Sequence, residues 1–297
     1  MADEKTEAQP GCTEVAVQTE KAPKKSFGGD EWKNRCKTDA GATSGLLASY
    51  TAMGPHDGEK RAPADKFYLA PAIGFFVGMI LTFVSFVLYE IGFEVIVVVA
   101  IALSLLLAVR RFRPFGDLTD YGNRLMSKER GDAIGIGFAI AVGGVVFVCL
   151  VNASMMFVAI LWPLMIVVWT AAVAVVRYAK AGDGDAADMV GKIDRTAMIK
   201  SMVLSIVLAL IACIIVGVVY FCVNYESVFS SSMILNVIIA VIFGTIASWI
   251  TGWFIANRAN ERGEPVGDST LGAANGIAMA IVLVLFTFLA MYISITI

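Results

Sequence analysis

Residues 202–223 read MVLSIVLALIACIIVGVVYFCV, and none of these side chains is charged. A helix rises about 1.5 Å per residue, so about 20 such residues cross the roughly 30 Å hydrocarbon core of a bilayer. Lipid offers the backbone no hydrogen-bond partners, and a helix satisfies its own donors and acceptors within one segment. The stretch therefore predicts a transmembrane helix.

Six further apolar runs lie before and after this one. No Lys, Arg, His or Asp falls in any of the seven, and the one acid, Glu94, lies at the edge of its run. The chain is 58% hydrophobic and 16% charged, whereas soluble domains average about 45–50% and about 25%. We predict an all-α, polytopic integral membrane protein with about seven transmembrane helices. The predicted spans are 67–89, 93–109, 133–151, 156–176, 202–223, 233–256 and 271–295.

All 23 Lys and Arg residues lie outside these spans and on one side of the predicted membrane. Ten precede the first span, and six, five and two lie in the connections 110–132, 177–201 and 257–270. Short loops rich in Lys and Arg stay on the cytoplasmic side. We therefore predict a multi-pass protein of the cell (inner, cytoplasmic) membrane whose N-terminus and active face are cytoplasmic. Residues 1–44 are expected to form a disordered tail, and residues 45–297 the membrane-embedded helical domain.

Several classes of function are disfavoured by composition. Ion-coupled transporters carry ionisable residues inside the membrane, and the interiors of these spans have none. The net charge of −2 gives no basic footprint for nucleic acid. His56 is the single histidine, so a metal site built from several histidines is excluded.

The connection that begins at residue 110 reads RRFRPFGDLTDYGNRLMSKERGDA. Asp117 and Asp120 are three residues apart and would share one face of a helix, and Asn123 and Arg124 extend that face. Carboxylate and amide oxygens suit Mg²⁺, which is commonly held by one or two carboxylates together with substrate phosphates. Arginines just upstream, among them Arg113, suit phosphate. The alternative is a set of ordinary juxtamembrane charges in water.

The last charged connection ends in Gly-Asp-Ser-Thr and leads into a Gly- and Ala-rich segment. Ser269 can accept hydrogen bonds from the free amides of a helix start, and such a start attracts anions. Asp268 beside it is a candidate to hold a metal ion that bridges to the anion. A helix cap without a ligand is the alternative.

Three segments occur in an order and spacing that resembles the cobalamin synthase family, the adenosylcobinamide-GDP ribazoletransferases. They are GDLTDYGNRLMSKERGDAIG (116–135), VGKID (190–194) and GDSTLGAAN (267–275), and the resemblance covers about residues 45–295. It implies a Mg²⁺-assisted reaction in which a ribose hydroxyl of α-ribazole, or of its 5′-phosphate, attacks phosphorus of adenosylcobinamide-GDP and GMP leaves.

The residues expected to act follow from the carboxylate spacing and from this resemblance. Catalysis and Mg²⁺ binding are expected of Asp117, Asp120 and Asp268. Substrate binding is expected of Arg113, Asn123, Arg124, Arg130, Lys192, Asp194, Gly267 and Ser269. For Lys192 and Asp194 the resemblance implies either phosphate binding or ordering of their loop.

The chain also departs from the family pattern. The family's His-Leu-Asp-Gly reads Pro-Phe-Gly-Asp at 114–117, and its next Asp-Gly reads Asn-Arg at 123–124. Each departure moves or removes a charge near the expected site. We therefore expect a divergent member, and leave open a non-catalytic family member or a corrinoid-binding membrane protein. The expected partners are the two substrates and membrane lipid, and a homo-oligomer is left open.

Overall fold

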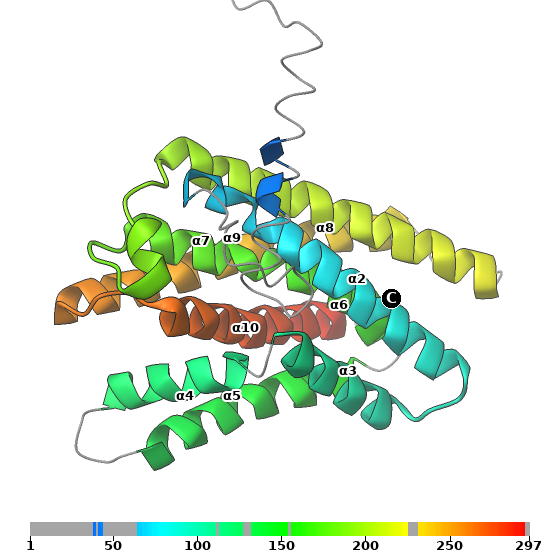
Figure 1. Cartoon of the computed structure of the whole chain (residues 1–297). Helices are drawn as coiled ribbons and strands as arrows, with labels where there is room; N and C mark the ends of the chain where they lie inside the picture. Colours follow the sequence, from blue (N-terminus) through cyan, green and yellow to red (C-terminus); the bar gives the residue numbers. More distant parts are fainter. Residues whose placement is uncertain are drawn as a thin grey trace, which may run out of the picture.

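The computed structural model describes residues 38–39, 41–43, 64–110, 113–126, 132–153, 156–224 and 231–294. Within these residues the chain is a bundle of helices, and its β-structure there is a single isolated bridge (Figure 1). The elements are η1 (Ala64–Leu69), α2 (Ala70–Glu90), α3 (Val95–Val109), α4 (Arg113–Met126), α5 (Asp132–Asn152), α6 (Met156–Val167), α7 (Trp169–Tyr178), η2 (Gly184–Asp188), α8 (Arg195–Asn224), α9 (Ser231–Arg262) and α10 (Asp268–Ser294).

Six helical segments in the described part of the chain are long and apolar enough to cross a membrane. They are Asp65–Glu90, Ala133–Asn152, Val158–Tyr178, Arg195–Val219, Val237–Arg262 and Asp268–Phe288. Helix α3 has 15 residues, about 22 Å, and is short for the roughly 30 Å core. It reaches a spanning length only together with α4, at a bend of 81°. Helix α4 is itself polar and amphipathic, so we place it outside the apolar spans. The predicted fold class is confirmed, with six to seven spans.

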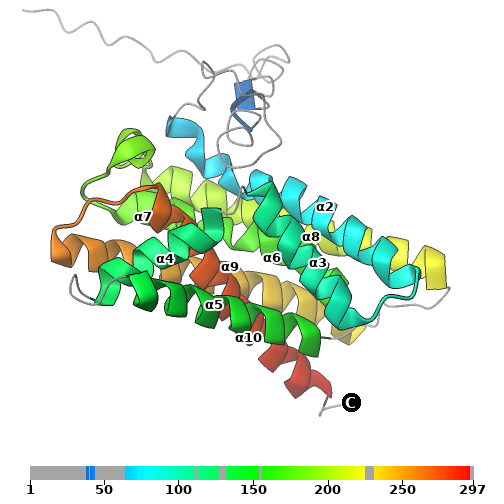
Figure 2. The ribbon, with the colours of Figure 1, turned by 60° about the horizontal axis from the view of Figure 1, so that its bottom comes forward.

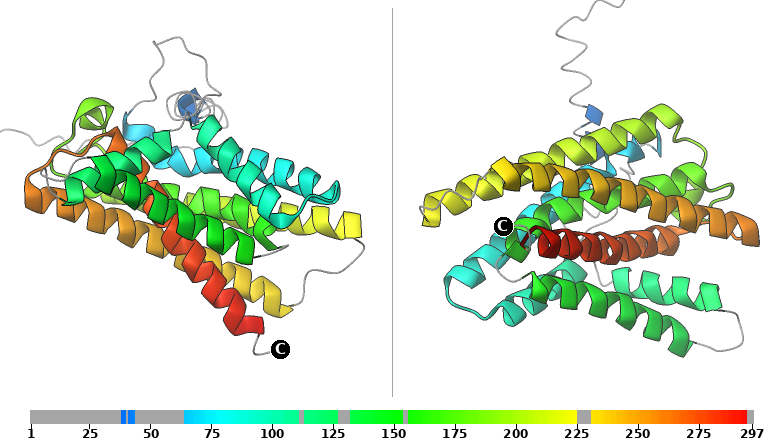
Figure 3. Two further views of the ribbon diagram at one scale, coloured as in Figure 1. Left: turned by 90° about the horizontal axis from the view of Figure 1, so that it is seen from below. Right: turned by 180° about the vertical axis from the view of Figure 1, so that it is seen from behind.

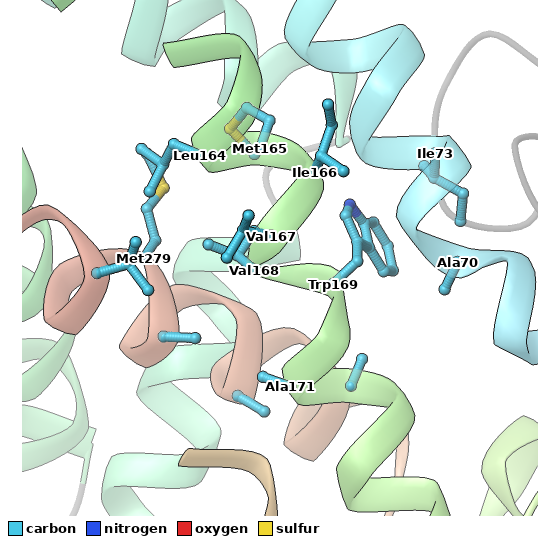
Figure 4. Packing of buried hydrophobic residues seen from close by; sticks show 14 of the residues in the cluster. Ala70, Ile73, Leu164, Met165, Ile166, Val167, Val168, Trp169, Ala171 and Met279 are labelled. Atoms are coloured by element: carbon cyan, nitrogen blue, oxygen red, sulfur yellow. The ribbon is translucent and has the colours of Figure 1, made fainter. Parts of the chain in front are cut away.

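The fourth predicted span forms the centre of the bundle. It consists of α6 and α7, which are separated by a turn at Val168. In the most apolar 18 residues of the segment Val158–Tyr178, 89% are buried, against at most 61% in the corresponding window of any other span. Both α6 and α7 contact α2, α8, α9 and α10, and Figure 4 shows Val167 and Trp169 in the layer between α2 and α10. A helix that is apolar on every side is typical of such a buried position.

The other helices pack around this centre. Helix α4 packs on α5 and on α10 (Figure 2). Helix α9 packs on α8 and on α10, as the rear view in Figure 3 shows. The start of α10 therefore contacts both α4 and α9, and the candidate site lies there.

Glycines let helices meet at their backbones. A Cβ atom at Gly74 of α2 would overlap the carbonyl of Met165, and one at Gly252 of α9 would overlap the carbonyl of Ala171. Small residues allow this close packing in membranes. On α5, by contrast, a Cβ at Gly144 would meet no atom within 4 Å.

Most of the predicted tail, residues 1–44, lies outside the described residues, and so does Arg130. The end of the tail is helical at residues 38–39 and 41–43. Lys66 Nζ donates a hydrogen bond of 2.7 Å to the Asp39 carboxylate, and Ala42 is 3% exposed. This short segment therefore packs on the bundle, and disorder of the preceding residues stays a prediction.

Candidate functional site at the basic end

The charged connections meet at one end of the bundle, called here the basic end. It comprises helix α4, the start of α10, and the connections 179–194 and 263–267. The Arg262 guanidinium group donates hydrogen bonds to the carbonyls of Arg124, at 2.8 Å, and Leu125, at 3.1 Å. A cation at a helix C-terminus satisfies its last carbonyls, so Arg262 joins α9 to α4.

Two further contacts join α9 and the segment that follows it to the connection after α7. The Asn260 amide oxygen accepts a 2.9 Å bond from the Lys180 N–H, and its NH₂ group donates a 2.8 Å bond to the Tyr178 carbonyl. A parallel β-bridge pairs Gly182 with Val266. The predicted convergence of the charged connections is therefore present in the fold.

A small pocket opens beside these contacts, at the start of α10. Its lining residues are Arg110, Arg113, Asp117, Trp169, Asp268, Leu271, Gly272 and Asn275. Its volume is about 20 Å³, and a water molecule needs about 10–15 Å³. We call it the carboxylate pocket. It has room for about one water molecule or metal ion, and a nucleotide does not fit inside it.

Two glycines of α10 let α4 approach closely. A Cβ atom at Gly272 would overlap the Asp117 carboxylate, and one at Gly276 would lie 3.1 Å from Leu118. The two glycines are four residues apart and so share one face of α10, which is the small-x-x-x-small arrangement of tight membrane helix pairs. The position of Asp117 therefore depends on the missing side chain at Gly272.

Two polar side chains of the carboxylate pocket are almost completely buried. Arg110, which follows α3, is 8% exposed, and its guanidinium lies 5.2 Å from the centre of the Trp169 ring. This cation–π contact fixes the guanidinium beside the pocket. Asn275 is 3% exposed, and its amide oxygen has no hydrogen-bond partner among the described residues. Leaving such a group unpaired costs about 1–3 kcal/mol, which a ligand in the pocket would offset.

The carboxylate pocket contains as many acidic groups as basic ones. Burial raises the pKa of the Asp117 carboxyl to about 7, the guanidinium groups of Arg110 and Arg113 lower it, and Asp120 and Asp268 raise it. The lining contains two guanidinium and two carboxyl groups. Acidic and basic groups in one pocket suit a ligand that carries both charges, such as a metal ion with a phosphate group.

The Mg²⁺ ion implied by the family resemblance fits these donors. The carboxylates of Asp117 and Asp268 and the amide oxygen of Asn275 are hard oxygen ligands, which Mg²⁺ prefers. In the described part of the chain, no group of three or more His, Cys, Asp and Glu side chains is arranged to hold a metal. The pocket offers two carboxylates, and a Mg²⁺ ion bound together with substrate phosphates commonly uses one or two protein carboxylates.

Other residues predicted on α4 lie elsewhere. Asp120 is exposed and does not line the carboxylate pocket. The Asn123 amide oxygen accepts a 2.9 Å bond from the Gly135 N–H and so holds α5 against α4. Arg124 lines a second pocket, described below.

Apart from Asp268, the predicted residues of the other two connections do not line the carboxylate pocket. Asp194 Oδ1 accepts a 2.6 Å bond from the Ala197 N–H, so Asp194 caps the start of α8. Lys192 is exposed, and Ser269 lies half-buried in the first turn of α10. Gly267 directly precedes α10, and its carbonyl accepts the first backbone bonds of that helix. Neither Lys192, Ser269 nor Gly267 lines either pocket described here.

Sequence reasoning did not identify Trp169 and Asn275 as pocket residues. Asn275 is a polar residue within the Gly- and Ala-rich start of a membrane helix, and that is a usable signal. Trp169 lies in a uniformly apolar span, where nothing in the sequence distinguishes it from a packing residue.

Fold and pocket together define a multi-pass helical membrane protein with a pocket of acidic and basic side chains at its basic end. Comparisons of the chain with protein-family models, with curated proteins and with solved structures find no match. The resemblance to the cobalamin synthase family therefore depends on the quoted motifs alone.

Proposed function

We propose that this protein is a membrane transferase that acts on a diphosphate-containing substrate with Mg²⁺ at its basic end. The carboxylate pocket carries the proposal, because it combines the side-chain oxygens of Asp117, Asp268 and Asn275 with the guanidinium groups of Arg110 and Arg113. The proposed substrates are adenosylcobinamide-GDP and α-ribazole, or its 5′-phosphate. This choice comes from the motif resemblance.

The chemistry asks for neutralised phosphate charge and an aligned nucleophile. Asp117, Asp268 and Asn275 would hold Mg²⁺, which when bound neutralises charge on the diphosphate. Arg110 and Arg113 bind phosphate oxygens, and guanidinium groups match the geometry of phosphate well. A ribose oxygen forms a new bond to phosphorus, the P–O bond to GMP breaks, and the hydroxyl proton is released to solvent.

The small size of the carboxylate pocket restricts how such a substrate binds. With about 20 Å³ available, only the metal ion enters, and the phosphate groups would lie at the mouth of the pocket. The guanosine and corrinoid parts would lie across the basic end, in water. By the positive-inside rule this end faces the cytoplasm, and the proposed location is the cell membrane.

The direct test is GMP release by the purified full-length protein from adenosylcobinamide-GDP and α-ribazole, with Mg²⁺ or with a chelator. We expect GMP and an equal amount of the joined product with Mg²⁺, and none with the chelator. Absence of GMP above background, with monodisperse and helical protein, would contradict the proposal.

A second candidate is a corrinoid-binding membrane protein without catalysis. One observation favours it: the described residues contain no cluster of three or more metal-ligating side chains. Equilibrium binding separates the two. Tight binding of adenosylcobinamide-GDP that is unchanged by a chelator, with no GMP formed, supports the second candidate and excludes the transferase.

A further inference from the structure

A second pocket at the basic end is rich in arginine. Its lining includes Arg124 of α4, Arg258 and Arg262 of α9, Glu264 and Thr270. We call it the arginine pocket. Three guanidinium groups face one carboxylate among these residues, so the pocket is positive, unlike the carboxylate pocket.

The acidic side chains near the arginine pocket do not neutralise its positive charge. Glu261 accepts a 3.0 Å bond from Arg258, but the two side chains are 49% and 60% exposed. Exposed ion pairs contribute only about 0–1 kcal/mol, so a phosphate group can displace Glu261. Even with Glu261 counted, cationic side chains outnumber the acids.

One guanidinium of the pocket is held rigidly. Arg262 uses one N–H of each terminal nitrogen to bind the carbonyls of Arg124 and Leu125. A guanidinium group has five N–H donors, so three remain after these two bonds. A pre-positioned guanidinium loses less side-chain entropy when it binds an anion.

The arginine pocket lies at the depth of lipid headgroups. Helix α9 contains 32 residues, about 48 Å, and its last turns extend beyond a hydrocarbon core of roughly 30 Å. Trp253 is 41% exposed, and exposed Trp residues are enriched at the membrane interface. Arg258 follows Trp253 by five residues, about 7.5 Å along the helix. Basic pockets between membrane helices at this level bind anionic headgroups.

We infer that the guanidinium groups around the arginine pocket bind a phosphate group at its mouth, because the pocket itself has a volume of only about 20 Å³. The phosphate group is supplied by an anionic phospholipid headgroup or by a free phosphate compound. The inference is independent of the proposed transferase. It needs neither a metal ion nor a corrinoid, and it uses no residue that lines the carboxylate pocket.

The test is the thermal unfolding of the full-length protein in detergent, because a ligand that binds the folded state raises the unfolding temperature with its concentration. One arm adds dihexanoyl phosphatidylglycerol, a second adds dihexanoyl phosphatidylcholine, and a third adds sodium diphosphate. The double variant Arg124→Gln/Arg258→Gln is compared with Arg195→Gln/Lys200→Gln. The second pair removes the same charge from the start of α8, outside both pockets.

We expect phosphatidylglycerol or diphosphate to stabilise the wild type, and phosphatidylcholine to have no effect. The pocket variant should bind at least about tenfold more weakly, because bonds to charged groups contribute about 1.5–3 kcal/mol each. The matched control should bind as the wild type does. Stabilisation by phosphatidylglycerol alone identifies lipid as the source, and stabilisation by diphosphate alone identifies a soluble phosphate.

Three outcomes overturn the inference. Neither anion stabilises the wild type, the pocket variant binds the anion as tightly as the wild type, or the control variant loses as much affinity for the anion as the pocket variant. If the double variant does not fold, Arg258→Gln against Arg195→Gln gives the same comparison with a smaller expected loss. Asp117 does not line the arginine pocket, so Asp117→Asn should leave stabilisation by phosphatidylglycerol unchanged. This variant therefore separates a failure of the transferase proposal from a failure of this inference.

Discussion

Gly272 determines how closely the Asp117 carboxylate approaches α10. The carboxylate occupies the space that any Cβ atom at this position would need. The contact joins a charged group of α4 to a residue near the start of α10, 155 residues further along the chain. A single methyl group is therefore enough to alter the carboxylate pocket.

We predict that Gly272→Ala lowers the free energy of unfolding by about 1–3 kcal/mol, the usual cost of overpacking. The matched control is Gly144→Ala on α5, where the new Cβ meets open space. Alanine is favoured over glycine in helices by about 0.5–1 kcal/mol, so the control should be neutral or stabilising. Thermal unfolding in detergent measures both, and equal stability of the two variants would refute the close contact.

At the same scale, sequence reasoning identified part of the site. Asp117 and Asp268 were predicted as candidates, and the structure brings both to one pocket. Asp120 was predicted beside Asp117 from helical spacing, which fixes a shared direction but not the depth of burial. Asn275 contributes from α10, and which residues of α10 meet α4 depends on helix packing that no local pattern encodes.

At the scale of elements, the last turns of α9 hold the basic end together. Asn260 bonds to the backbone of Lys180 and Tyr178, and each such bond contributes about 0.5–1.5 kcal/mol. We predict that Asn260→Ala loses about 1–3 kcal/mol of stability. Asn257→Ala, at an exposed site on the same helix, should lose little stability. Similar unfolding temperatures for the two variants would disprove this role.

A second element-scale prediction concerns the start of α8. Because Asp194 caps this helix, Asp194→Ala should cost about 0.5–2 kcal/mol, whereas Asp194→Asn keeps a capping oxygen and should cost little. Unfolding curves of the two variants distinguish capping from phosphate binding. If asparagine is as harmful as alanine, the charge rather than the cap is what matters.

The apolar runs predicted the membrane helices well, and their ends less well. The predicted span 233–256 is shorter than helix α9, which continues to Arg262, because a helix that leaves the membrane can persist through charged residues. The central position of α6 and α7 was not predictable. All the spans are apolar, so their composition does not distinguish a helix that faces lipid from one that is covered by other helices.

For the whole molecule, the one-sided distribution of Lys and Arg predicts that the basic end faces the cytoplasm. In a cysteine-free background, we expect Lys192→Cys to react with an impermeant maleimide only after the cells are opened. Ile91→Cys, at an exposed site after α2, should react in intact cells. The opposite labelling pattern would reverse the orientation.

We propose that the residues of the carboxylate pocket catalyse the joining of α-ribazole to adenosylcobinamide-GDP with release of GMP. The most direct measurement is the rate of GMP release by Asp117→Asn and Asp268→Asn, beside the control Asp188→Asn at an exposed position of η2. Loss of a catalytic or metal-binding carboxylate should lower the rate at least about 100-fold, and the control should match the wild type. Wild-type rates in folded Asp117→Asn or Asp268→Asn would contradict the claim.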